Sequence, residues 1–328
     1  MDGTAVPGVR SPRRRKLFRV VGALLIVSAL LAVVGAVYEA IAEARDRADY
    51  PPPGQLVDVD GHWMHINCSG AGSPTVIIDA GLGDWSTGWV WVQAEVAATT
   101  RVCTFDRAGI GWSEPGPLPR TARQSTQELH TLLGRAGIEP PYLVVGHSMG
   151  GLHARVFAAD YRSEVSGLVL IEAMNPGAGP VRTPVCTGPR SLFGFDSIPA
   201  ALARVGLVRL LGGPLGLHPG LPTTVAGSYA ARGARPDSAA TFLDESRALP
   251  ESLEQARSVQ TLGSLPLLVL SRNSPAAQDA AWQARQSDLL RLSDRSAQSF
   301  ADRSGHLVAI DQPEAAVAAI VQMVHRVR

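Results

Sequence analysis

Short apolar segments rich in β-branched residues alternate with helical stretches over most of this chain. The expected strands read PTVIIDAG, RVCTFDR, PYLVVGHS, SGLVLIEA and LPLLVLSR, and each ends near a glycine, a serine or a charge. Between them lie helical patterns such as TARQSTQELHTLLGRAG and GLHARVFAADYRSEV. Strands that alternate with helices form a mostly parallel sheet with helices on both faces. The sequence therefore predicts an α/β fold.

Two further features divide the expected domain. The segment QLVDVDGHWMHINCSG predicts a hairpin that turns at Asp60 and Gly61. From about residue 174 to 262 no strand pattern appears, and the segment is rich in Gly and Pro with amphipathic pieces such as IPAALARVGLVRLL. An insertion of this length between two strands predicts a helical cap over the carboxyl edge of the sheet. We assign the core to residues 55–173 and 262–328 and the cap to residues 174–261.

The N-terminal region is biased in both charge and hydropathy. Six basic residues and one acid precede residue 20, so a net charge of +1 leaves about −4 for the remainder, and nucleic acid is not expected as a partner. Residues 20–37 carry no charge, and this run is long enough to cross a bilayer. Because the basic side of a span stays in the cytoplasm, we expect a cytoplasmic tail (1–19), a transmembrane anchor (20–41), a linker (42–54) and an extracytoplasmic domain.

Two alternatives to a retained anchor stay open. The small-x-small sites AIA (40–42) and AEA (42–44) fit a cleaved signal peptide, although the apolar part of such peptides usually has about 7–15 residues. The segment RRKLF (14–18) loosely resembles a twin-arginine signal. All three alternatives export the domain, and the retained anchor predicts a single-pass protein of the cell membrane.

Export bears on the three cysteines, because disulfides form in oxidising compartments. Cys68 and Cys103 lie in two expected strands. A bridge between them is feasible if those strands are neighbours in the sheet, with Cα atoms about 4.4–6.8 Å apart. The alternative is two buried free thiols. Cys186 would be left without a partner.

The segment GHSMG places Ser148 between an expected strand and an expected helix. The glycines at 146 and 150 leave room for a sharp turn, which lifts the serine hydroxyl above the sheet edge. A serine hydroxyl needs a base to remove its proton. His306 is the expected base, because it lies in a loop between the last strand and the terminal helix.

The acid of the site has two candidate positions. Glu172 directly follows the strand GLVLI, next to the strand of the nucleophile, and a carboxylate there can orient and stabilise the His306 imidazole. After the strand LPLLVL the first acid is Asp279, several residues late and in an expected helix. We favour Glu172 and keep Asp279 as the alternative.

An oxyanion hole needs two preorganised N–H donors. The residue after the nucleophile, Met149, is expected to supply one. The second is expected from the loop AGLGDW, at the Leu82 amide, where Gly81 and Gly83 let the backbone approach a ligand closely.

Together these residues resemble the α/β-hydrolase superfamily over about residues 55–328. The likeness is carried by DAGLG, FDRAGIGWSEPG, GHSMGG, GLVLIEAMNP and SGHLVAIDQPE. The resemblance implies an eight-stranded sheet with a helical cap after the sixth strand, here preceded by one transmembrane helix, and it implies that Cys68 and Cys103 lie on neighbouring strands. It also implies structural roles for Asp106 and Arg107.

Two details of the resemblance bear on the chemistry. An acid after the sixth strand is similar to some haloalkane dehalogenases, but those enzymes and epoxide hydrolases use an aspartate nucleophile, so Ser148 argues against both reactions. The chain departs from the superfamily at Ala80-Gly81, where many members have His-Gly, and after the seventh strand, where the usual carboxylate is missing.

The sequence thus predicts a membrane-anchored serine hydrolase, most simply an esterase acting through an acyl-enzyme on a small-molecule ester with an apolar portion. Amide hydrolysis, perhydrolysis and lyase chemistry on the same site are alternatives, and a catalytically silent surface binding protein is the alternative from another class. No cofactor or metal is expected, because the sequence has no HExxH, no paired Cys motif and no dinucleotide fingerprint.

Overall fold

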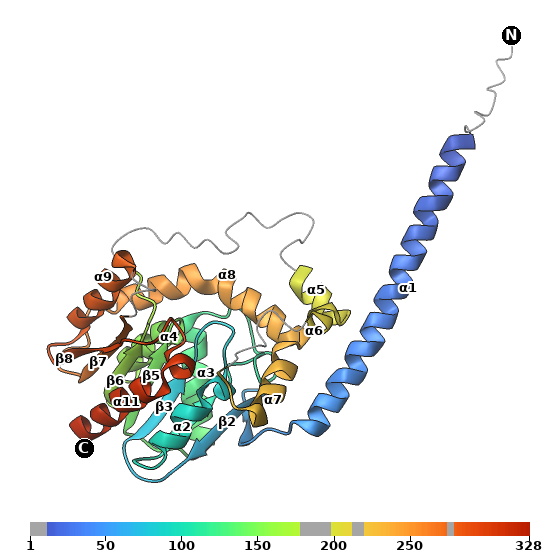
Figure 1. Ribbon diagram of the computed structural model, residues 1–328. Coiled ribbons are helices and arrows are strands. Elements are labelled where there is room, and N and C mark those ends of the chain that lie inside the picture. Colours follow the sequence, from blue (N-terminus) through green and yellow to red (C-terminus); the bar gives the residue numbers. More distant parts are fainter. Residues whose placement is uncertain (1–11, 178–197, 212–219, 274–278) are drawn as a thin grey trace.

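The computed structural model describes residues 12–177, 198–211, 220–273 and 279–328 and contains an eight-stranded sheet (Figure 1). The strands are β1 (Gln55–Val59), β2 (His62–Ser69), β3 (Thr75–Asp79), β4 (Val102–Phe105), β5 (Tyr142–His147), β6 (Val165–Ile171), β7 (Leu267–Arg272) and β8 (Ser296–Ala301). Their order in the sheet is β1-β2-β4-β3-β5-β6-β7-β8. β2 runs antiparallel to both of its neighbours, and every other pair is parallel. The expected eight-stranded, mostly parallel sheet is confirmed.

The first two strands form the expected hairpin. Asp60 and Gly61 connect them with positive φ angles of 53° and 96°. A two-residue turn with both residues in this region matches the right-handed twist of the strands, and Asp-Gly is a preferred pair for it.

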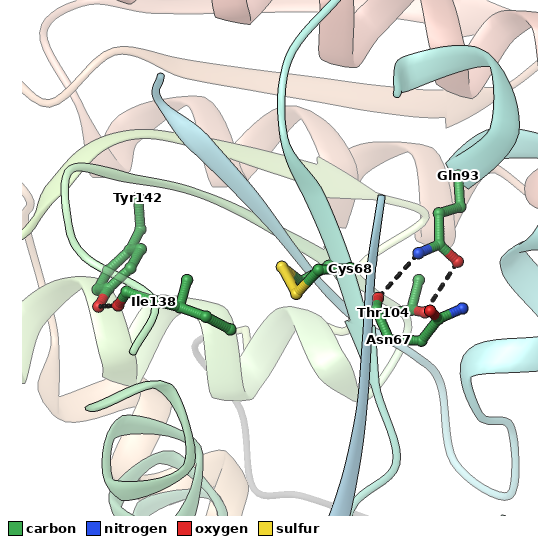
Figure 2. Close-up of a disulfide and its surroundings, with 7 residues drawn as sticks. Asn67, Cys68, Gln93, Thr104, Ile138 and Tyr142 are labelled. Carbon is green, nitrogen blue, oxygen red and sulfur yellow. Dashed lines mark hydrogen bonds between the residues drawn. A yellow bond between two sulfur atoms is a disulfide. The ribbon is translucent and has the colours of Figure 1, made fainter. Parts of the chain in front are cut away.

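β2 and β4 are neighbours in the sheet, as the resemblance implied, and a disulfide joins them (Figure 2). Cys68 and Cys103 lie directly opposite each other in the register, with their Cα atoms 4.0 Å apart. This separation is shorter than the expected range of about 4.4–6.8 Å and also shorter than the roughly 4.5 Å of close antiparallel pairs. Beside the disulfide, the Gln93 side chain donates to the Asn67 carbonyl and accepts from the Thr104 hydroxyl. Cys186 lies outside the described residues.

Helices cover both faces of the sheet, as the strand–helix alternation predicts. On one face α2 (Val90–Val96) and α11 (Pro313–Val327) pack against apolar residues of the central strands. On the other face α3 (Ala122–Arg135), α4 (Gly150–Asp160) and the 3-10 helix η4 (Leu289–Leu292) bury a second apolar cluster. The short helices η1 (Ser86–Trp89), α9 (Ala280–Asp288) and α10 (Val308–Asp311) lie in connections between these elements.

The described part of the insertion between β6 and β7 is helical, in agreement with the expected cap. It contains α5 (Ile198–Arg204), α6 (Leu207–Leu210), α7 (Thr223–Gly233) and α8 (Pro236–Ser258). Leu249, Leu253 and Ala256 of α8 form an apolar cluster with Met149 and with other residues of α3 and α4. In Figure 1 α8 runs along one side of the sheet domain, and α5, α6 and α7 lie between it and the N-terminal helix.

The N-terminal helix α1 (Pro12–Asp49) projects from the body of the molecule (Figure 1). Its most apolar eighteen-residue window has a mean hydropathy of 2.8 and is not buried by the protein, so α1 is long and apolar enough to cross a membrane. The first part of the expected linker at 42–54 is helical, because α1 continues to Asp49. Residues 38–49 are rich in Ala, Glu and Arg, which favour helix, and the non-helical joint is limited to residues 50–54 around PPPG.

Candidate active site

Ser148 lies at the sharp turn between β5 and α4 and has a positive φ of 52°. Glycines on both sides make this turn feasible. A Cβ atom at position 150 would lie 2.3 Å from the Asp79 carbonyl oxygen, and one at position 146 would lie 2.5 Å from the Gly150 carbonyl oxygen. No larger residue fits such close backbone contacts, so the GHSMG pattern permits a tight strand-to-helix reversal with the serine at its tip.

His306 lies in the loop between β8 and α10, and its ring reaches Ser148. The distance from His306 Nε2 to Ser148 Oγ is 2.9 Å, and the distance from His306 Nδ1 to Glu172 Oε2 is 3.3 Å. A carboxylate can only accept, so the proton on the neutral ring is at Nδ1 and the Nε2 lone pair faces the serine hydroxyl. This is the protonation state that a base acting on Ser148 requires.

Glu172 directly follows β6 and is fully buried, with a positive φ of 46°. Besides His306, its carboxylate accepts from the Arg272 amide at 2.8 Å, from Arg272 Nη1 at 3.0 Å and from Trp282 Nε1 at 3.0 Å. Burial alone would raise the pKa of Glu172, but hydrogen bonds from His306, Arg272 and Trp282 outweigh it and hold the pKa below its ordinary value. Glu172 is therefore ionised and fixed in position at neutral pH.

The alternative acid, Asp279, lies at the start of α9. Asp279 is the N-cap of α9, and its carboxylate accepts from the backbone amides of Ala281 and Trp282. This is the usual function of an aspartate in front of a helix. The structure thus brings Glu172 to His306 and gives Asp279 a capping position.

The two expected oxyanion donors lie beside the nucleophile. Met149 follows Ser148 at the N-terminal end of α4, and the Leu82 side chain packs against the apolar cluster that contains Met149. The loop that carries Leu82 passes close to the serine, since a Cβ at Gly81 would lie 3.3 Å from Ser148 Cβ. The loop that carries Leu82 and the start of α4 therefore both lie next to Ser148.

A buried network of ion pairs around Arg107 holds the loop that carries Leu82. The Arg107 guanidinium donates to the carbonyl oxygens of Ala80 and Gly81, each at 2.8 Å, and pairs with Asp79 and with Glu245 of α8. Burial would raise the pKa of Asp79, but His153 and Arg107 more than compensate and lower it. The structural role implied for Arg107 agrees with these contacts. Glu245 was not predictable from the sequence, because no local pattern connects a cap helix to this arginine.

His147, the residue before the nucleophile, contacts the loop of the expected base. Its Nε2 lies 2.9 Å from the His306 carbonyl oxygen, which can only accept, so Nε2 carries the proton. Burial, reinforced by the neighbouring His306, lowers the pKa of His147 to about 4. His147 is therefore a neutral donor that supports the His306 loop at physiological pH.

Arg272 and Trp282 were also missed, although Arg272 has a signal in the sequence. It is the last residue of β7, directly before the positions where the superfamily that the chain resembles usually has an acid. The Trp282 ring contacts both Arg272 and His306. Arg272 Cζ lies 5.3 Å from the centre of the Trp282 ring, and the ring centres of Trp282 and His306 are 5.6 Å apart. Both side chains position Glu172 and His306.

The fold and this arrangement of residues define a class, and the comparison with protein families agrees with it. A family model described as the alpha/beta hydrolase fold matches residues 74–313. The chain belongs to the α/β-hydrolase family.

The chain is also similar to individual proteins in sequence and in structure. It is 28% identical over 260 residues to the uncharacterized protein YqjL of Bacillus subtilis (strain 168), a match that covers 78% of this chain and 85% of YqjL. A thermophilic esterase from Thermogutta terrifontis superposes with a TM-score of 0.62 and 22% identity, over 83% of this chain and 98% of the esterase. The epoxide hydrolase CorEH superposes equally well, with a TM-score of 0.63 and 19% identity, over 84% of this chain and 99% of that one. Structural similarity at this identity shows the fold alone.

Proposed function

We propose that this protein is a serine hydrolase that cleaves carboxylic esters outside the cytoplasm while anchored in the membrane by α1. The contact of His306 Nε2 with Ser148 Oγ at 2.9 Å, together with the buried Glu172 behind the ring, carries the proposal. An aspartate would have to stand at position 148 for the usual epoxide or haloalkane chemistry, so the serine favours acyl transfer.

In the proposed reaction, Ser148 Oγ attacks the ester carbonyl while its proton moves to His306 Nε2. Glu172 stabilises the imidazolium that forms, and the Leu82 and Met149 amides bind the negative oxygen of the tetrahedral intermediate. His306 then protonates the leaving alcohol, and water, activated by the same ring, releases the acid from the acyl-enzyme. The first proton transfer follows the hydrogen bond between Ser148 Oγ and His306 Nε2, and the later ones use the same nitrogen.

The surroundings of the serine favour an apolar substrate portion. Leu82, Met149 and Met174 contact the same apolar cluster as Leu249 and Leu253 of the cap helix α8. Met174 also donates its amide to the Ser148 carbonyl oxygen at 2.8 Å, so this side chain begins directly beside the nucleophile. Apolar groups of a substrate that contact these side chains leave water, which stabilises the bound state.

Membrane anchoring is supported by α1 and by the charges before it. The apolar run of α1 is not covered by the protein, and Arg19 with five further basic residues precedes it. This charge distribution supports a cytoplasmic N-terminus and a domain outside the cytoplasm, and the Cys68–Cys103 disulfide agrees with an oxidising compartment.

A fluorophosphonate probe tests the hydrolase site directly. We expect the folded full-length chain to form a covalent adduct and the Ser148→Ala variant to form none. Hydrolysis of a panel of esters of increasing chain length should be lost in the same variant. Folded wild-type protein that neither labels nor turns over would favour a surface binding protein instead.

A further inference from the structure

The cap helices α5 and α6 carry a cluster of exposed apolar side chains. The cluster, which we call the α5–α6 face, consists of Ile198, Leu202, Leu207, Leu210 and Leu211. The exposed fraction is 77% for Leu211, 66% for Leu210 and about 40% for the other three residues. In the described part of the chain, these are five of the ten exposed large apolar residues outside α1. Single exposed leucines are ordinary on protein surfaces, but such a concentration within fourteen residues marks an interaction surface.

The helices that carry this face, α5 and α6, lie beside α1 (Figure 1). A Cβ atom at Gly35 would lie 2.3 Å from the Val205 carbonyl oxygen, and one at Gly206 would lie 2.7 Å from the Tyr38 ring. Two glycines therefore let the α5–α6 junction touch α1 directly. Gly35 is two residues from the end of the uncharged run at residue 37, about 3 Å along the helix axis. The junction is thus at the level where α1 leaves its apolar section.

The charges around α6 divide this region into a polar and an apolar side. Arg209 pairs with Glu39 at 2.8 Å and with Asp46 at 2.7 Å, both on the polar C-terminal part of α1. The Arg209 guanidinium is therefore neutralised by two acids that follow the apolar run of α1 in the sequence. Residues 198–211 contain no acid, and the exposed Arg204 adds a positive charge next to the leucines. Apolar residues with basic residues among them are typical of segments that lie in a membrane interface.

We propose that the α5–α6 face inserts into the interfacial region of the bilayer that α1 enters, so that the cap lies on the membrane. The proposal rests on the membrane anchoring proposed above and is independent of the hydrolytic chemistry. Interfacial helices bury their apolar face about 5–10 Å deep, and Leu211 is only five residues beyond the Gly206 contact with α1. The leucines therefore lie within reach of the acyl chains without any rearrangement of the cap.

Spin-label accessibility on the full-length chain tests the proposal. Single cysteines for a nitroxide are introduced as Leu211→Cys, Val27→Cys and Phe300→Cys, each with Cys186→Ser and with the Cys68–Cys103 disulfide intact. Phe300 is a matched control, since it is an exposed apolar residue on β8, at the sheet edge opposite β1. The labelled proteins are reconstituted into vesicles of phosphatidylcholine and phosphatidylglycerol. Collisions with oxygen, which concentrates in lipid, are compared with collisions with a water-soluble nickel chelate.

We expect the label at 211 to favour oxygen, as the label at 27 does, and the label at 300 to favour the chelate. A label at 211 that behaves like the one at 300, while the one at 27 favours oxygen, overturns membrane docking of the cap and leaves the anchor intact. Labels at 27 and 211 that both favour the chelate overturn the anchor as well. Fluorophosphonate labelling of the same proteins reports separately on Ser148.

Discussion

Ser148 and Glu172 share a backbone conformation that residues with side chains rarely adopt. Each directly follows a parallel strand, and their φ angles are 52° and 46°. The left-handed region costs about 1–2 kcal/mol for such a residue. Asp60 has a similar φ angle in an ordinary hairpin turn, but Ser148 and Glu172 meet at one histidine. The concentration of strain at this place is typical of functional sites.

Position relative to strand ends made these residues predictable. Ser148, Glu172 and His306 each follow an expected strand, and parallel strands bring their carboxyl ends to one edge of the sheet. The contact of Trp282 with Glu172 was not predictable, because it depends on how α9 returns to the sheet. Sequence patterns report the direction of a strand but not the packing of a helix several residues beyond it.

The first residue-scale prediction concerns the acid. We expect Glu172→Gln to lower kcat by about 10³–10⁴-fold, because the amide offers one acceptor where His306, Trp282 and Arg272 require two oxygens. Asp279→Asn should change kcat by less than about twofold, since asparagine is an equally good N-cap. Steady-state kinetics on a soluble ester measure both variants. A larger loss in the Asp279 variant would reassign the acid.

A second prediction concerns stability at acid pH. The pKa of His147 is about 4 in the folded protein, so between pH 4 and the ordinary value of 6.5 the unfolded chain binds a proton that the folded chain does not. Folding stability therefore rises with pH across this window and falls on acidification, by roughly 3 kcal/mol for a shift of this size. His147→Gln should keep a donor toward the His306 carbonyl and flatten this dependence. Urea unfolding in detergent at pH 4.5 and 7 measures the slope, and an unchanged slope would contradict the assignment.

At the scale of elements, α8 connects the cap to the loop beside the nucleophile. Its Glu245 pairs with Arg107, which in turn holds the carbonyl oxygens of Ala80 and Gly81. The strands of the core were predictable as elements, because β-branched runs between turn residues are a strong local signal. The existence of cap helices was also predictable, but Gly and Pro breaks left their limits open. The contact of α8 with Arg107 is a long-range ion pair, which no periodicity reveals.

This ion pair gives a prediction with a control on the same helix. Glu245→Ala leaves a buried guanidinium with one acid fewer, and we expect a loss of about 3 kcal/mol in the free energy of unfolding. Asp244→Ala removes a partly exposed pair with Arg247 and should cost less than about 1 kcal/mol. Chemical denaturation of both variants in parallel tests the difference. Equal losses would mean that Glu245 does not hold the loop through Arg107.

At the scale of the whole molecule, α1 and the catalytic body form a connected unit. The sequence predicts an anchor separated from the domain by a linker, whereas the helix continues to Asp49 and contacts the cap. Arg232 of α7 donates to the Tyr50 carbonyl oxygen at 2.7 Å, and Trp112 donates to the same oxygen at 3.0 Å. These contacts join residues far apart in the chain, so local patterns could not predict them. They fix the direction of α1 relative to the rest of the molecule.

This connection predicts a difference between dissolved and membrane-bound substrates. In vesicles, we expect Leu210→Gln combined with Leu211→Gln to lower hydrolysis of a long-chain ester dissolved in the bilayer several-fold, because the cap loses its apolar contact with the interface. Hydrolysis of a short water-soluble ester should be unchanged, since both leucines are exposed and lie outside the cluster around Ser148. Phe300→Gln is the matched control and should alter neither rate. The ratio of the two rates, measured on the same vesicle preparation, cancels differences in the amount of active protein. An equal ratio in all three proteins would show that substrate reaches Ser148 without help from the α5–α6 face.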